Sequence, residues 1–312
     1  FFKREFCNNA KVWDPDRVII IPDHYVFTAD EKAHRNVDTL RQFAAEQSLP
    51  YFYDVGTPRY QGVCHVALPE QGHVRPGEVI FGTDSHTCTH GALGGFATGI
   101  GNTDAGFVMG TGKLLIKAPP TMRFVIEGQK PWFITGKDII LRIIGDIGVD
   151  GATYSAMEFS GSAVSQLSIE ERMTICNMAI EAGGKNGIIQ PDKKTIEYVK
   201  ARTNTPFEPV YGDTDAVVAS EHRYEADRLV PCVAEPHSPA NYAPASERTD
   251  IKLDRAYIGS CTGGKLTDFV MAANMLKGRT VSIQTFLVPA TSEVTEGMLR
   301  HTIDGKSLVE IF

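Results

Sequence analysis

Three chemically active side chains stand next to one another in the stretch GTDSHTCTHG: Asp84, Ser85 and His86. A histidine gives or takes a proton near neutral pH, and a carboxylate beside it fixes its tautomer and stabilises its charged form. The stretch follows the short apolar run VIFG and leads into GALGGFATGIG, which is rich in glycine. Glycine lets the backbone approach a ligand or another element closely. This combination indicates a loop that carries acid–base chemistry.

Further acid–base groups occupy similar places in the chain. Asp23 and His24 follow the apolar run VIIIP, and His65 lies in QGVCHVALPEQG, shortly after YFYDV. A single histidine after a strand is roughly three times more often a structural residue than a catalyst. Together with Asp84 and His86, however, the set supplies two Asp–His pairs and one further histidine. Such a set favours a shared site for proton transfer.

Cys261 has the most suggestive surroundings of the six cysteines. It lies in YIGSCTGGK, between a predicted strand and a predicted helix and among three glycines. Backbone amides at a helix N-terminus favour a thiolate. The alternatives are a small buried residue in a tight turn and a nucleophile, although no His or Asn is locally arranged to support a nucleophile. The cysteines are scattered without a CxxC pair, so we expect reduced thiols rather than disulfides.

The elements that must position these groups alternate between strand and helix. Capping boxes at Thr28 with Glu31 and at Ser168 with Glu171 predict two helix starts. Such alternation is typical of an α/β protein with largely parallel sheets. In these proteins ligands bind beyond the carboxyl ends of the strands, which is where the polar clusters lie. Short apolar runs predict strands at 16–22, 51–55, 77–82, 120–128, 252–260 and 280–289, and helical spacing predicts helices at 28–47, 136–148, 171–184 and 265–278.

Length and charge exclude several classes of protein. The 312 residues suffice for roughly two domains, and residues 205–250, rich in Pro, Asp, Glu and Ser, are predicted to connect domains. The formal net charge of -7 lacks the basic footprint of a nucleic-acid binder. No apolar run approaches the ~18 to 20 residues that span a bilayer, so no membrane partner is expected.

Five motifs together resemble the aconitase superfamily, and within it the large-subunit family of 3-isopropylmalate dehydratases. They are GTDSHTCTHGALGGFATGIGNTDAG, IPDH, GVCHVALPEQGHVRPGE, MTICNMAIEAGGKNGI and IGSCTGGK. The resemblance covers essentially the whole chain. It implies aconitase-like α/β/α domains with largely parallel sheets around a central active-site cleft. The implied boundaries are 1–118, 119–246 with a connector, and 247–312, the last being the incomplete start of a third domain.

The resemblance also implies an activity and its alternatives. The implied enzyme is a hydro-lyase of leucine biosynthesis that interconverts 2-isopropylmalate and 3-isopropylmalate by dehydration and rehydration. A homoaconitase or aconitase-type hydro-lyase acting on another malate-like acid is the first alternative. The second is a non-catalytic regulatory relative that has lost its metal cluster. In either enzyme the substrate would be a small 2-hydroxy dicarboxylate.

Site roles follow from the resemblance motif by motif. Cys261 would be the first ligand of a 4Fe-4S cluster whose open iron acts as the Lewis acid. Lys265 would replace an arginine that binds the substrate carboxylate in many relatives. The remaining roles are Asp23 and His24 as the pair that protonates the departing hydroxyl, His65 and Asp84 as a second oriented pair, His86 against the substrate or iron-bound water, Glu158 as a carboxylate near that water, and Ser85 close to the substrate.

The chain departs from the family pattern in a second respect, besides the GSCTGGK motif that has Lys265 where many relatives carry GSCTN and a nearby arginine. The other two cluster ligands form a CxxC pair in relatives, and no cysteine follows Cys261 here. We therefore expect a fragment truncated at both ends, with an incomplete cluster and little activity alone. The resemblance implies a heterodimer with a small subunit whose swivel domain carries the catalytic serine and further substrate-binding arginines. The expected location is the cytoplasm, or an organelle stroma or matrix in a eukaryote.

Overall fold

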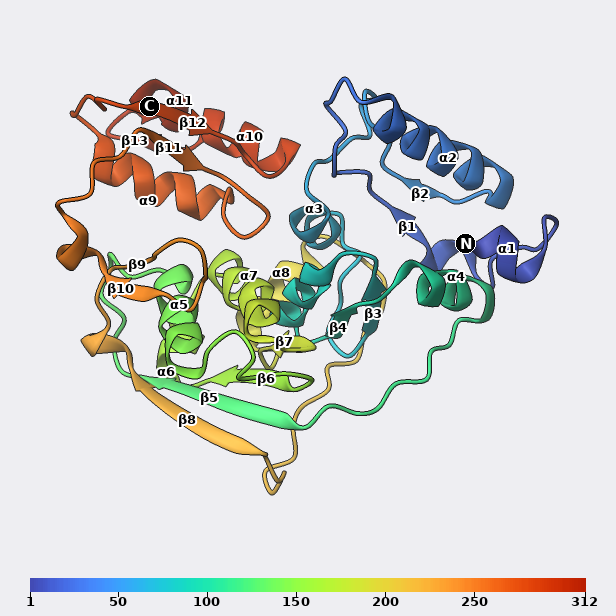
Figure 1. Cartoon of the computed structure of the whole chain (residues 1–312), viewed down its shortest axis with the longest axis horizontal. Coiled ribbons are helices and arrows are strands. Elements are labelled where there is room, and N and C mark those ends of the chain that lie inside the picture. Colours follow the sequence, from blue (N-terminus) through green and yellow to red (C-terminus); the bar gives the residue numbers. More distant parts are fainter.

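The structure, a computed structural model, describes all 312 residues. Figure 1 shows three units, with the N-terminal and C-terminal units lying on the same side of a central unit. Most sheets are parallel, as predicted: four of the six sheets contain only parallel strand pairs, and the two antiparallel pairs are short. No helix has the length and apolar character that crossing a membrane requires.

The N-terminal unit contains two parallel strand pairs, and its helices lie around them. Its strands are β1 (Ile19–Ile20) paired with β2 (Tyr51–Phe52), and β3 (Val79–Gly82) paired with β4 (Phe96–Gly99). Its helices are α1 (Phe2–Phe6), α2 (Glu31–Gln47), α3 (Cys64–Glu70) and α4 (Asn102–Thr111), with the 3-10 helices η1 (Pro15–Arg17) and η2 (Ser85–Leu93). Strand β4 lies outside the predicted strands, because its residues FATG belong to the glycine-rich run.

The central unit is built on a four-stranded parallel sheet in the order β7-β6-β5-β8. Helices α5, α6 and α7 lie over one face of this sheet (Figure 1). The strands are β5 (Thr121–Glu127), β6 (Ala156–Ser160), β7 (Asn186–Ile188) and β8 (Ser220–Glu225), and the helices are α5 (Gly136–Ile147), α6 (Ser162–Gln166), α7 (Ile169–Asn177), the 3-10 helix η3 (Met178–Ala182) and α8 (Lys193–Lys200). The predicted connector at 205–250 is therefore partly wrong, because β8 completes this sheet.

The C-terminal unit begins after the antiparallel pair β9 (Cys232–Ala234) and β10 (Tyr242–Pro244) and the short 3-10 helix η5 (Ala245–Arg248). Its parallel strands β11 and β12 are joined by α9, the arrangement that the strand–helix–strand pattern predicts. The elements are β11 (Arg255–Ile258), α9 (Leu266–Leu276), β12 (Gln284–Leu287), α10 (Ser292–Arg300), the hairpin β13 (Thr302–Ile303) and β14 (Lys306–Ser307), and α11 (Leu308–Ile311).

Helix caps confirm one predicted capping box and correct the other. Ser168 accepts a hydrogen bond from the Glu171 amide at the start of α7, and the Glu171 carboxylate accepts from the Ser168 amide. Helix α2, by contrast, is capped by Asp30, whose carboxylate accepts from the Lys32 amide. The Thr28 hydroxyl instead accepts from the amide of Asp30, just before the helix begins. The prediction placed the cap two residues too early because Asp and Thr are both good caps.

The main apolar core lies in the central unit, and the site corner belongs to it. Thirty buried residues form this core, and they include Cys88 and Leu93 of η2. Separate clusters of five buried residues stabilise the N-terminal and C-terminal units. Because η2 packs into the largest of the three cores, its residues are held more firmly than a surface loop would be. The main core contains residues from both sides of position 118, and the domain boundaries near 118 and 246 stay predictions.

A seam joins the N-terminal and C-terminal units just before α3. The Val63 amide donates to the Ala290 carbonyl at 2.8 Å, and the Ser292 amide donates to the Gln61 carbonyl at 3.0 Å. Gly62 has a φ of 110°, and a Cβ added there would lie 2.2 Å from the Ala290 carbonyl oxygen. Only glycine fits this close approach. The seam thus sets α3 against the start of α10.

Glu70, at the end of α3, carries a carboxyl buried at this seam. Its Oε1 accepts from the Thr291 hydroxyl at 3.1 Å, whereas its Oε2 has no partner. Arg202 lies nearby but pairs with Glu293 at 3.4 Å. Burial therefore dominates and raises the pKa of Glu70 from 4.5 to about 7.

This raised pKa predicts a measurable pH dependence. The folded protein holds a proton on Glu70 that the unfolded chain releases at lower pH. The contribution of this protonated carboxyl to the free energy of unfolding is therefore complete below about pH 4.5 and is lost as pH rises through about 7. At pH 8 the variant Glu70→Gln should therefore have a free energy of unfolding, measured by urea denaturation, that is roughly 2 to 3 kcal/mol higher than that of wild type. At pH 5 the two free energies of unfolding should be similar. The exposed control Glu296→Gln should behave alike at both pH values. An equal effect of Glu70→Gln at both pH values would contradict the assignment.

Candidate active site

The corner after β3 holds Asp84, Ser85 and His86 against the core. Asp84 caps η2, its carboxylate accepting from the His86 amide at 2.7 Å. The backbone packs closely around this corner at two glycines. A Cβ on Gly91 would lie 1.8 Å from the Gly187 carbonyl oxygen. A Cβ on Gly99 would lie 2.6 Å from the Asp84 carbonyl oxygen. The predicted role of the glycines in close packing is confirmed at these two positions.

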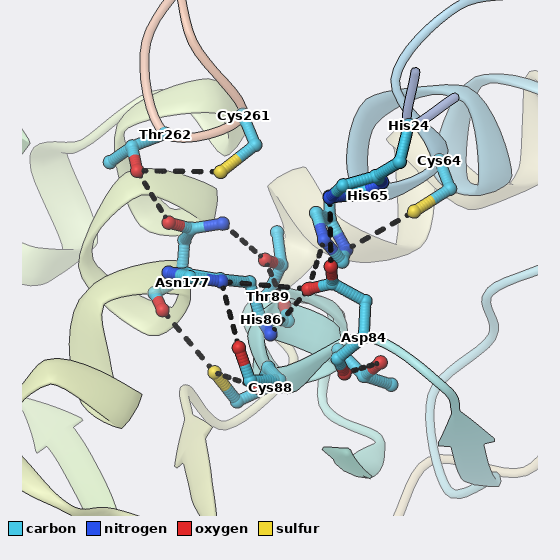
Figure 2. Close-up of polar contacts among 12 residues, drawn as sticks. His24, Cys64, His65, Asp84, His86, Cys88, Thr89, Asn177, Cys261 and Thr262 are labelled. Carbon is cyan, nitrogen blue, oxygen red and sulfur yellow. Dashed lines mark hydrogen bonds and ion pairs between the residues drawn. The ribbon is translucent and has the colours of Figure 1, made fainter. Parts of the chain in front are cut away.

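The Asp84 carboxylate is the acceptor on which the histidines converge (Figure 2). His65 Nε2 donates to Asp84 Oδ1 at 2.9 Å, and the His65 side chain is only 2% exposed. His24 Nε2 lies 3.4 Å from Asp84 Oδ2, and His86 Nδ1 lies 3.5 Å from Oδ1. These donors keep the pKa of Asp84 far below its usual value, the contact with His65 being the largest cause. Asp84 is consequently ionised throughout the physiological range.

Asp23 and His24 form the second predicted pair. His24 Nδ1 donates to Asp23 Oδ1 at 2.7 Å, and the other oxygen of Asp23 accepts from the Cys64 amide at 2.8 Å. The Asp23 carboxylate is nearly buried, whereas the His24 side chain is 66% exposed. The hydrogen bond to Asp23 raises the pKa of His24 above 6.5. His24 therefore presents a proton-carrying Nε2 to the solvent side of Asp84.

His86 is oriented by a carboxylate that the sequence analysis missed. His86 Nε2 donates to Glu181 Oε1 at 3.1 Å, and Ser85 Oγ lies 3.2 Å from His86 Nδ1. The contact with Asp84, and then that with Glu181, raises the pKa of His86. Glu181 lies in η3, which follows α7, and the motif MTICNMAIEAGG that contains it was recognised without a role for its acid.

Glu158 does not join this cluster. It lies on β6, where its carboxylate is 3.6 Å from Arg123 Nε and accepts from Gln190 Nε2 at 3.3 Å. The carboxylate in contact with His86 is Glu181, and the predicted place of Glu158 near an iron-bound water stays a prediction. The strand register explains the contact of Glu158 with Arg123, since it pairs these two residues across β6 and β5.

Cys261 projects from the loop after β11 toward the acid–base residues, on the opposite side of the site from His24 and His65 (Figure 2). Its thiol is partly accessible and lies 3.9 Å from the Thr262 hydroxyl. Lys265 is buried and donates to the Thr262 carbonyl, and burial lowers its pKa. A buried lysine that supports its own loop gives no support to the predicted role in binding a substrate carboxylate.

Three other groups near the site are held neutral by burial. Burial raises the pKa of the Cys64 thiol well above 9, and raises that of Cys88 to about 12. Burial lowers the pKa of His90 to about 3, and His90 Nδ1 has no hydrogen-bond partner. No group of three or more His, Cys, Asp or Glu side chains is placed to hold a metal ion. The residues described here therefore do not by themselves fit a complete iron–sulfur site. Cys261, whose thiol is partly accessible and projects toward the acid–base residues, is the candidate ligand that they offer.

The acid–base residues line a broad hollow. It has a volume of about 1920 Å³, and Asp23, His24, His65 and Asp84 lie on its wall. A second cavity of about 460 Å³ lies behind Ser85, at the junction with Tyr154 and Lys185 of the central unit. The first volume exceeds the ~300 to 1,000 Å³ typical of small-molecule pockets. The site is thus open on the side of His24.

Comparison with known proteins agrees with this architecture. The sequence profile of the aconitase family (aconitate hydratase) matches residues 9–306. Because the match covers nearly the whole chain, and because parallel α/β units place paired acids and histidines around one cleft, the chain belongs to the aconitase family.

Individual relatives carry a more particular name. The chloroplastic 3-isopropylmalate dehydratase large subunit of Arabidopsis thaliana is 56% identical over 323 residues, covering 100% of this chain and 64% of that protein. The large subunit 1 of the same enzyme from Methanopyrus kandleri is 46% identical, over 94% of this chain and 70% of that protein. The Aquifex aeolicus large subunit is 43% identical, over 97% and 69%. The chain thus spans less than two thirds of the Arabidopsis relative.

The shared role of Asp84 predicts how the histidines titrate. Replacing Asp84 by Asn removes the largest cause that raises the pKa of His86, whereas Glu181→Gln removes a smaller one. The pKa of His86, followed by NMR of the imidazole nitrogens, should fall toward 6.5 in both variants and further in Asp84→Asn. The exposed His301 serves as the unaffected reference. A larger fall in Glu181→Gln would show that Glu181, and not Asp84, controls His86.

Proposed function

We propose that the chain is the acid–base part of a 3-isopropylmalate dehydratase large subunit, which interconverts 2-isopropylmalate and 3-isopropylmalate by dehydration and rehydration. One observation carries the proposal: Asp23 with His24, His65 with Asp84, and His86 with Glu181 converge within an aconitase-family fold. The names of relatives at 43–56% identity favour this substrate over other malate-like acids. The pathway would be leucine biosynthesis.

Loss of hydroxide from the substrate needs a proton, and His24 is placed to give it. Its pKa is raised by Asp23, so a protonated fraction persists near neutral pH. When the carbon–oxygen bond breaks, the proton on His24 Nε2 passes to the departing oxygen, which leaves as water. Rehydration returns the proton to His24. The ionised Asp84 stabilises the imidazolium form throughout.

His86 and Ser85 have a binding role in this proposal. Glu181 fixes the ring of His86 through Nε2, and Ser85 Oγ faces Nδ1. The Ser85 hydroxyl beside His86, whose pKa is raised by Asp84 and Glu181, suits a carboxylate or hydroxyl of a small 2-hydroxy dicarboxylate. His65 is buried, so it supports Asp84 and does not itself reach the substrate.

A 4Fe-4S cluster and a small subunit would complete the enzyme. In the family the cluster supplies the Lewis acid that polarises the departing hydroxyl, and Cys261 would be one of its ligands. The open hollow and the exposed His24 support a partner that closes the site. We place on that small subunit, in its swivel domain, the base that removes the carbon-bound proton. The name of the Arabidopsis relative places that protein in the chloroplast, and an organelle or cytoplasmic location of this chain stays a prediction.

Turnover tests the proposed substrate directly. The full-length protein, reconstituted anaerobically with iron and sulfide and mixed with its small subunit, should interconvert the two isopropylmalates, with the alkene intermediate followed by its ultraviolet absorbance. Turnover of citrate or homocitrate without turnover of isopropylmalate would contradict the substrate and favour an aconitase or homoaconitase. Omission of the small subunit should abolish the reaction and serves as the control.

A pair of glutamate variants tests which carboxylate serves the site. Glu181→Gln should lower kcat by about 10- to 100-fold, because His86 loses both its orientation and part of its charge. The matched variant Glu158→Gln should leave kcat nearly unchanged, since that carboxylate contacts only Arg123 and Gln190. The reverse ranking of the two variants would instead support the role of Glu158 that the sequence resemblance implies.

A further inference from the structure

Asn177, the last residue of α7, contacts both halves of the site without belonging to its acid–base set. Its side chain is completely buried. The Nδ2 donates to Thr89 Oγ1 at 2.8 Å, and the Oδ1 accepts from Thr262 Oγ1 at 2.7 Å. Figure 2 shows the amide between the η2 corner and the loop that carries Cys261. The main-chain carbonyl of Asn177 also accepts from the Cys88 thiol at 3.3 Å.

Each of the two threonines is also linked to a residue of the site, Thr89 by a hydrogen bond and Thr262 through the main chain. Thr89 Oγ1 donates to the His86 carbonyl at 2.6 Å. Thr262 follows Cys261 directly in the chain. The main-chain carbonyl of Thr262 accepts at 3.2 Å from the hydroxyl of Thr174, which lies one turn before Asn177 on α7. All these contacts are shielded from water, because Thr89, Thr174 and Thr262 are buried. A satisfied buried network of this kind fixes one arrangement of the elements it joins.

The directions of the two hydrogen bonds that the Asn177 amide makes are determined. A hydroxyl has one proton, and that of Thr89 is used on the His86 carbonyl, so Thr89 can only accept from Asn177. Thr262 must then donate to the remaining carbonyl oxygen of the amide. Only a side chain with a donor on one end and an acceptor on the other satisfies both neighbours, which excludes aspartate.

We propose that Asn177 is a positioning residue that sets the place of the Cys261 loop relative to the His86 corner. It acts through Thr262 on one side and through Thr89 on the other, so a change at Thr89 is transmitted to Cys261 although the two do not touch. Glu181 lies four residues further along and orients the His86 side chain. A single segment of the central unit, 174–181, thereby aligns residues from the N-terminal and C-terminal units.

Thiol reactivity tests this proposal without turnover, so a wrong substrate assignment does not affect the result. The full-length protein is freed of iron by chelation, and the rate of Cys261 alkylation by iodoacetamide is measured by peptide mass spectrometry against the exposed Cys7. The variants are Thr262→Val and Thr89→Val, which keep shape and remove the hydroxyl. Thr262→Ser and Thr89→Ser, which keep the hydroxyl, are the matched controls. The buried Cys88 and Cys176 report loss of the fold.

The expected result is a rise in Cys261 alkylation of about 5-fold in Thr262→Val, the factor that corresponds to the net contribution of one hydrogen bond. Thr89→Val should also raise it, by about 2-fold or more, whereas both serine variants should match wild type. The double valine variant should not exceed the larger single effect, because both changes act through one amide.

An unchanged rate of Cys261 alkylation in Thr89→Val would overturn the proposal. The Asn177 amide would then not couple the position of Thr89 to that of the Cys261 loop. The same conclusion follows if the serine variants change the rate as much as the valine variants do. If Cys88 and Cys176 also react in Thr262→Val, that variant has lost its fold and Thr89→Val decides, because it lies in a different unit.

Discussion

The arrangement of the site depends on one partly buried negative charge, the Asp84 carboxylate. It accepts from the side chain of His65 and the backbone of His86, and it lies within reach of His24. A carboxylate in so confined a place is stable only while donors surround it. The rings of His65, His24 and His86 are therefore held in place by the one carboxylate that their nitrogens approach. The acid–base set is one electrostatic unit rather than three separate pairs.

The fold supplies that unit from elements that are distant in the chain. Strand β3 and η2 bring Asp84 and His86, α3 brings His65, the segment after β1 brings His24, and η3 brings Glu181. Parallel strands end at the same edge, so side chains at their carboxyl ends meet without any special loop. The glycines at 91 and 99 then allow η2 to contact the central unit at backbone distance. Close packing, and not flexibility, is what the glycine-rich run provides.

Much of this was predictable from local patterns, and the failures have identifiable causes. Asp23, His24, His65, Asp84 and His86 follow apolar runs, so both their type and their position in the fold carried a signal. Glu181 carried none of its own, because an acid within a helical segment resembles any solvated surface residue. The contact of Glu158 with Arg123 was not predictable, since a motif resemblance does not determine to which side of a strand a side chain points. The burial of Lys265 was not predictable either, because burial of a lysine beneath its own loop leaves no mark in the sequence.

The seam between residues 61–63 and 290–292 has a consequence for the order of assembly. The contact between Ser292 and the Tyr60 carbonyl joins positions 232 residues apart. Contacts of such sequence separation form late in folding, after local helices and short strand pairs. During synthesis His24, His65 and Asp84 emerge long before Cys261, so the acid–base half exists for a time without the thiol that faces it. The complete site is consequently one of the last features that a nascent chain acquires.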